Sequence, residues 1–319
     1  MNGAESLIRS FTAAGVNVCF ANPGTSEMHL VQAVDAVPEM RAVLSLFEGV
    51  CTGAADGYGR MTGMPATTLL HLGPGLGNGI ANLHNARRAS TPVINLIGNH
   101  ALYHMDYDAP LTSDIGTLAK NVSSWVKGDS TASSLATDGM LALQFALTAK
   151  PGSAGQISTM IIPADACWNE EGAAASYINA PERRKVDDKV VSEVAQLLDN
   201  SSMILINSDG LSIEARIAAN RISEKTGCRV SMTPFPSRVD GGAGLPGCER
   251  LPYFPEQVLA ALNGVEKLIL AGADSPVSFF AYPNTPSVLV PKNCAVVRLS
   301  ESEEDTTQAL ESLADFLGV

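Results

Sequence analysis

A glutamate and a histidine in the N-terminal half stand where proton chemistry is possible. Glu48 follows the largely apolar run 44–47 and precedes Gly49, where a helix is expected to begin. In an open parallel sheet, the carboxyl ends of the strands form the ligand crevice. A carboxylate there is partly desolvated, which favours sharing a proton with a ligand. The structural alternative is a first-turn glutamate that only interacts with the helix dipole.

His71 ends a second apolar run and adjoins the glycine-rich segment 72–79, Leu-Gly-Pro-Gly-Leu-Gly-Asn-Gly. Because glycine has no side chain, the backbone of this segment can approach a ligand closely. The segment is neither the dinucleotide fingerprint G-x-G-x-x-G nor a phosphate loop, because no Gly-Lys-Ser/Thr follows. The alternatives are a tight turn before a closely packed helix and a core histidine with satisfied hydrogen bonds.

Alternating strand and helix patterns surround these residues. The expected strands of the first half are 16–21, 41–47, 66–72, 92–98 and 157–163. The expected helices are 5–14, 25–37, 49–61, a helix that follows a glycine-rich turn at 73–79 and ends near 88, and 132–149. Segment 100–127 is expected to be a long loop with a helical piece. Short apolar strands between helices predict a parallel sheet covered on both faces.

The alternation stops at 166–186, which mixes small, charged and proline residues, and then restarts. The expected strands of the second half are 203–207, 229–232, 267–271, 287–290 and 295–299. Its expected helices are 188–199, 212–225, one soon after Pro255, and 306–317. The predicted fold class is therefore α/β, with domains 1–165 and 187–319 joined by the linker 166–186. Each domain is expected to be a mainly parallel sheet flanked by helices.

Composition narrows the class of protein. The 319 residues are 45% hydrophobic and 17% charged, with a net charge of −12, which disfavours nucleic acid and anionic membranes as partners. The six cysteines are scattered, so we expect free thiols rather than disulfides or a zinc site. No apolar run approaches the roughly 20 residues of a membrane-spanning helix. We expect a soluble cytoplasmic protein.

Three segments taken together resemble the thiamine diphosphate (ThDP)-dependent 2-oxo-acid decarboxylases and carboligases, the group of acetolactate synthases and benzoylformate decarboxylases. The segments are 15–25 (GVNVCFANPGT), 48–63 (EGVCTGAADGYGRMTG) and 73–98, with its opening Gly-Pro-Gly. The likeness covers residues 1 to about 165, which resemble the pyrimidine-binding domain. Residues 187–319 resemble the central domain of this family more loosely.

The resemblance implies ThDP as the cofactor and a 2-oxo acid as the substrate. Glu48 would hydrogen-bond ring nitrogen N1′ of the aminopyrimidine and favour its imino tautomer, which removes the thiazolium C2 proton. His71 falls where benzoylformate decarboxylase-like members place an active-site histidine. The implied catalytic residues are Glu48 and His71, with no metal ligand. The implied cofactor-binding residues are Asn22, Pro23, Gly24, Thr25, Glu48, Gly73, Pro74, Gly75 and Asn78.

Departures from the synthase pattern leave the reaction open. Phe47 and Gly49 flank the glutamate where synthases often have His and Gln. An acetolactate synthase-like decarboxylase or carboligase and a benzoylformate decarboxylase-like enzyme without a carboligase role both stand. So does a different class, a non-catalytic association module with a vestigial cofactor site. An NAD- or FAD-binding protein is disfavoured by the missing fingerprint. FAD, which some synthase relatives bind, is not supported by these residues.

The family also has a third domain, which binds the diphosphate and Mg²⁺ through a Gly-Asp-Gly motif that does not occur here. ThDP and Mg²⁺ would need that domain, in cis if the chain is a fragment or in trans if the enzyme is split. The chain alone is expected to be inactive. Family architecture further implies a homodimer or homotetramer.

Overall fold

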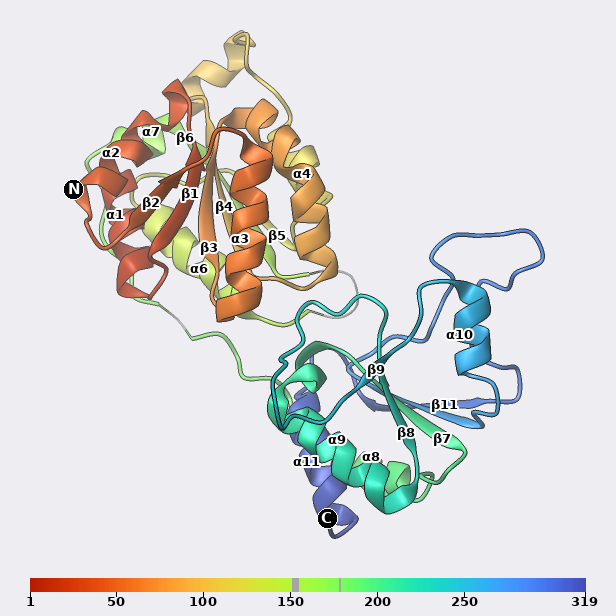
Figure 1. Cartoon of the computed structure of the whole chain (residues 1–319). Helices are drawn as coiled ribbons and strands as arrows, with labels where there is room; N and C mark the ends of the chain where they lie inside the picture. The colour runs from red at the N-terminus through yellow and green to blue at the C-terminus, as the bar shows by residue number, and fades with distance from the viewer. Residues whose placement is uncertain (151–154, 178) are drawn as a thin grey trace. The chain divides into compact units, whose positions relative to one another are not determined.

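The computed structural model describes residues 1–150, 155–177 and 179–319. The chain forms two compact units, Met1–Glu182 and Arg183–Val319 (Figure 1). Among the described residues, no helix is long and apolar enough to cross a membrane. The two units are called unit 1 and unit 2 below; the assignment of 166–186 as a linker stays a prediction.

Unit 1 contains a six-stranded sheet in the order β2-β1-β3-β4-β6-β5, and every pairing is parallel. The strands are β1 (Val18–Asn22), β2 (Arg41–Leu44), β3 (Ala66–Leu70), β4 (Val93–Asn99), β5 (Trp125–Lys127) and β6 (Ile157–Pro163). Strands β3, β4 and β6 are buried at every residue. This is the pattern of a parallel sheet with both faces covered.

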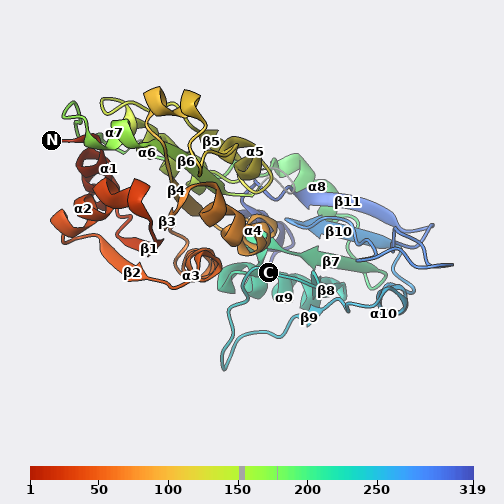
Figure 2. The same ribbon diagram turned by 90° about the horizontal axis from the view of Figure 1, so that it is seen from above.

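Two groups of helices cover the sheet of unit 1. The helices are α1 (Gly3–Ala13), α2 (Met28–Ala36), α3 (Glu48–Thr62), α4 (Leu72–Arg88), α5 (Ile115–Lys120), α6 (Leu135–Leu147) and α7 (Ala164–Trp168), with 3-10 turns η1 (Thr25–Glu27) and η2 (Leu102–Tyr107). Figure 2 shows α1, α6 and α7 on one side of the strands and α3 and α4 on the other. The sheet therefore separates two apolar cores, one around Phe11 and one around Leu76.

The expected glycine-rich turn at 73–79 was wrong, because α4 begins at Leu72 and these glycines form its first turns. Pro74 is tolerated there because the first N–H groups of a helix lack an intrahelical acceptor. A Cβ at Gly79 would lie 2.8 Å from Cγ2 of Thr52 on α3. The missing side chain thus lets α3 and α4 pack closely.

Unit 2 contains a five-stranded parallel sheet in the order β11-β10-β7-β8-β9. The strands are β7 (Ser202–Ile206), β8 (Arg229–Met232), β9 (Glu249–Arg250), β10 (Lys267–Ala271) and β11 (Ala295–Ser300). The helical segments are α8 (Asp188–Ala195), η4 (Ser208–Leu211), α9 (Ile213–Thr226), α10 (Pro255–Ala261) and α11 (Thr306–Phe316). The prediction of two α/β domains with mainly parallel sheets is confirmed.

The remaining differences concern short segments. Strands β5 and β9 and helix α7 were not expected. The strand expected at 287–290 was wrong: Val288 forms only an isolated antiparallel bridge with Val277. Pro286 and Pro291 bracket this apolar run. Because proline cannot donate to a ladder, the run cannot extend as a central strand.

Helix α9 offers a matched test of the core of unit 2. Ile222 is fully buried, whereas Ile217 is 42% exposed on the same helix. Ile222→Ala should lower the free energy of unfolding by about 2–5 kcal/mol, because it leaves a cavity. Ile217→Ala should cost about 1 kcal/mol or less. Urea denaturation measures both, and equal losses would contradict the packing described here.

Candidate functional site

The strand ends of unit 1 bring three sequence-distant segments together. Asn22, the last residue of β1, pairs in register with Leu70, the last residue of β3. The Pro23-Gly24 turn and His71 therefore leave adjacent strands at the same edge of the sheet. On the other side of β1, Leu44 ends β2 and is followed within four residues by Glu48, the first residue of α3.

Glu48 is held in a buried position at the start of α3. The residue is only 8% exposed, and its Oε2 accepts a hydrogen bond of 2.9 Å from Nδ2 of Asn78. A Cβ at Gly75 would lie 3.3 Å from Oε1 of Glu48 and 3.5 Å from Cβ of His71. Gly75 thus lies beside both the glutamate and the histidine, and a Cβ there would be tight against Oε1 of Glu48.

Hydrogen bonds between α3 and α4 fix the backbone of Glu48. Oγ1 of Thr52 lies 3.2 Å from the Glu48 carbonyl and 3.1 Å from the Gly79 carbonyl. Nδ2 of Asn82 donates to the Gly49 carbonyl at 2.6 Å. The position of the carboxylate therefore depends on the packing of the two helices as well as on its contact with Asn78.

His71 precedes α4 and pairs with a glutamate that sequence reasoning missed. Its Nδ1 lies 2.8 Å from Oε2 of Glu27, and the Gly24 N–H donates to the same oxygen at 2.8 Å. Glu27 is 0% exposed. The one available signal was the spacing Gly24-x-x-Glu27, which fits half of a capping box. Nothing in the sequence indicated that Glu27 meets a histidine 44 residues later.

The remaining predicted site residues divide into two groups. Asn78 contacts Glu48, and Gly24 lies against the His71 ring. Gly73 instead packs against the 108–114 loop, since a Cβ there would lie 2.1 Å from Oγ of Ser113. Thr25 and Pro74 are exposed. Among the described residues, no group of His, Cys, Asp and Glu could hold a metal ion, and the roles of these residues stay predictions.

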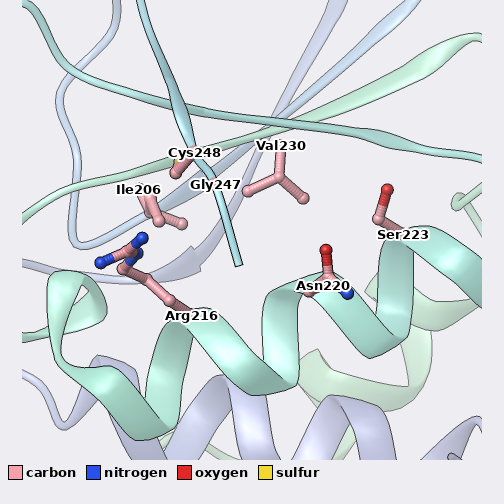
Figure 3. Close-up of a pocket in the computed structure, with 7 residues that line it drawn as sticks. All are labelled: Ile206, Arg216, Asn220, Ser223, Val230, Gly247 and Cys248. Carbon is pink, nitrogen blue, oxygen red and sulfur yellow. The ribbon is translucent and has the colours of Figure 1, made fainter. Parts of the chain in front are cut away.

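Unit 2 contains a cavity of about 110 Å³ that the sequence did not indicate (Figure 3). It is lined by Ile206, Arg216, Asn220, Ser223, Val230, Gly247 and Cys248. The guanidinium of Arg216 donates to the carbonyls of Asp240 and Pro246, and the residue is only 8% exposed. Arg216 therefore anchors the segment after β8 to α9. Burial raises the pKa of the Cys248 thiol, and the nearby Arg216 charge opposes this.

Comparison with known proteins identifies the first part of the chain. Residues 1–120 match the family model described as the thiamine pyrophosphate enzyme N-terminal TPP binding domain. A Mycobacterium tuberculosis protein provisionally named as an acetolactate synthase large subunit is 51% identical over 317 residues, 99% of this chain and 60% of that protein. Benzoylformate decarboxylase of Pseudomonas aeruginosa is 33% identical over 112 residues, 35% of this chain and 21% of that protein.

Solved structures share the fold of the whole chain. An enzyme of Mycobacterium smegmatis, provisionally assigned as thiamin diphosphate-dependent, has a TM-score of 0.84 at 22% identity. The match covers 99% of this chain and 62% of the chain of that enzyme. The 4-hydroxybenzoylformate decarboxylase of Rhodococcus jostii RHA1 has a TM-score of 0.82 at 21% identity, with coverages of 99% and 62%.

The chain thus spans about 60% of the length of the Mycobacterium tuberculosis relative that it matches along nearly its whole extent. The matched domain, residues 1–120, contains the edge of the sheet at which Glu48 and His71 lie. Residues 1–120, which lie in unit 1, therefore belong to the N-terminal TPP binding domain of the thiamine pyrophosphate enzymes.

Proposed function

We propose that unit 1 binds the aminopyrimidine of ThDP, with Glu48 at ring nitrogen N1′, in an enzyme that acts on a 2-oxo acid. The observation that carries this proposal is the buried carboxylate of Glu48 at the carboxyl edge of a parallel sheet, oriented by Asn78. That edge is where such sheets bind ligands. A carboxylate with little solvent around it is suited to share a proton with a ring nitrogen.

The surrounding residues fit a flat heterocycle. Asn78 engages Oε2 of Glu48, and Gly75 adds no side chain beside Oε1. Asn22, Pro23 and Gly24 would line the edge of the cofactor, since their turn leaves the neighbouring strand. When bound, ThDP supplies the electron sink for chemistry at the 2-oxo carbon. The chain contributes orientation and one proton held between Glu48 and N1′.

In this proposal, other residues bind the diphosphate and Mg²⁺. No metal-binding group is present among residues 1–150, 155–177 and 179–319. A diphosphate-binding domain, in cis or in trans, would complete the site, and the chain alone would be inactive. FAD has no supporting feature: the turn after β7 reads Asn-Ser-Asp-Gly-Leu-Ser rather than a glycine fingerprint.

The reaction would be decarboxylation, carboligation or both. The Mycobacterium tuberculosis relative bears a synthase name, whereas His71 at the site is the feature that favours a benzoylformate decarboxylase-like reaction. His71 would move protons on the substrate rather than on the cofactor. An association module with a vestigial site is the weaker candidate, because the contact between Glu48 and Asn78 is intact.

We further propose that the surface around Glu48 faces a second copy of the chain. Leu44 is 72% exposed, Leu46 92% and Val50 56%, and all three lie within four residues of Glu48. Contiguous exposed apolar residues of this kind mark association surfaces. A homodimer or homotetramer would cover them and exclude water from the carboxylate.

The role of Glu48 predicts a loss of proton transfer without a loss of stability. Glu48→Gln keeps the shape but cannot hold the N1′ proton. In enzyme completed with a diphosphate-binding domain, H/D exchange at C2 of bound ThDP should slow by roughly 10²–10⁴-fold. NMR measures the exchange, and Glu39→Gln, at an exposed position, is the control. Unchanged exchange in Glu48→Gln would refute the assignment.

The association proposal predicts that Leu46→Asp dissociates the completed enzyme to monomers, because the buried charge would lack a partner. Ile217→Asp, on the outer side of α9 in unit 2, should leave the assembly intact. Light scattering distinguishes the two outcomes. If the unmodified completed enzyme is itself a monomer, the proposed interface does not exist.

A further inference from the structure

A second buried carboxylate, apart from Glu48, is built into unit 1. Oε2 of Glu27 is 2.8 Å from Nδ1 of His71 and accepts the Gly24 N–H at the same distance. Oε1 of Glu27 is buried without a hydrogen-bond partner among the described residues. Burying a carboxylate in this way is costly unless a cationic or hydrogen-bonding partner is fixed beside it. The partner fixed here is the imidazole.

Two glycines leave the space that this pair fills. A Cβ at Gly98, in the buried strand β4, would lie 1.8 Å from Oε1 of Glu27. A Cβ at Gly24 would lie 2.3 Å from Nδ1 of His71. Gly24 has φ −113°, and Gly98 is not among the residues with positive φ. Neither glycine is needed for backbone conformation, so both are explained by the volume of the Glu27–His71 pair.

The hydrogen bonds also decide which ring nitrogen of His71 carries the proton. Oε2 of Glu27 already accepts the Gly24 N–H, as a carboxylate oxygen does. Because an ionised carboxylate has no proton to donate, Nδ1 of His71 is the donor in the second bond to that oxygen, and Nε2 has no proton in the neutral ring. The neighbouring Cys167 adds no charge beside this pair. Burial raises the pKa of its thiol to about 12, with the Glu27 charge as a second cause, so the thiol stays neutral.

We infer that Glu27 is a positioning residue: it holds His71 in the Nδ1–H tautomer and thereby presents Nε2 as a proton acceptor at the edge of the site. The His71 side chain is 26% exposed while Glu27 has no exposure, so the ring is the only member of the pair that a ligand reaches. The tautomer is a property of the chain alone. Its use on a substrate rests on the proposed function.

The competing interpretation is a capping contact only. In a capping box the glutamate at the third helical position accepts from the backbone N–H of the N-cap residue, and the Gly24–Glu27 contact fulfils this. In that case the imidazole would follow the preference of free histidine in water, which protonates Nε2. The two interpretations therefore predict opposite tautomers for His71.

Nitrogen-15 NMR of the histidine ring in the unmodified chain tests the inference. We expect His71 with Nδ1 protonated and Nε2 unprotonated above neutral pH. Glu27→Ala should convert the ring mainly to the Nε2–H tautomer, and Gly98→Ala should do the same by displacing the carboxylate. Glu39→Ala is the control at an exposed glutamate. An Nε2–H tautomer in the unmodified chain overturns the inference without any variant.

Activity of the completed enzyme separates this inference from the proposed function. Glu27→Ala should lower kcat by up to about 10²-fold, the lower end of a general acid–base contribution, with unchanged ThDP affinity. Glu27→Asp should be faster than Glu27→Ala but slower than the unmodified enzyme, because the side chain of aspartate is shorter. If the unmodified chain has the Nδ1–H tautomer but Glu27→Ala leaves kcat unchanged, His71 does not act on the substrate. The Glu48 proposal would still stand.

Discussion

The parallel pairing of β1 with β2 and β3 is the constraint on which the site depends. It aligns Ala21 with Leu44 and Asn22 with Leu70, so three chain segments leave the sheet at one edge. One of them leads to Glu48 and another to His71. Because a one-residue shift in register would turn a strand's side chains to the other face, the fully buried strand β3 fixes the position of His71 as firmly as it fixes the core.

Two carboxylates at this edge are held in different ways, which suits them to different work. Glu48 keeps an amide partner, Asn78, and lies at a helix N-terminus, where a ligand nitrogen can still be reached. Glu27 is fully enclosed and meets only the chain, through Gly24 and His71. Glycines at 24, 75 and 98 make room for these groups. The proposed roles follow this difference: Glu48 binds a ligand and Glu27 controls the neighbouring imidazole.

Sequence patterns predicted the parts of this arrangement that depend on local order. Glu48 was placed correctly at the start of a helix because an apolar strand precedes it. The start of α4 was misplaced because Gly73, Pro74 and Gly75 are typical of turns, whereas in the structure they form the first turn of the helix. Glu27 was missed because its partner, His71, follows β3, and the pairing of β3 with β1 is not visible in a linear pattern. Short strands such as β5 lack enough residues to show a period.

A structure of the completed enzyme with ThDP bound tests the central claim most directly. We expect a carboxylate oxygen of Glu48 at hydrogen-bonding distance, about 2.5–3.2 Å, from N1′ of the aminopyrimidine. Asn78 should keep its contact with the same carboxylate. A different protein group at N1′, with Glu48 turned away from the cofactor, would contradict the account.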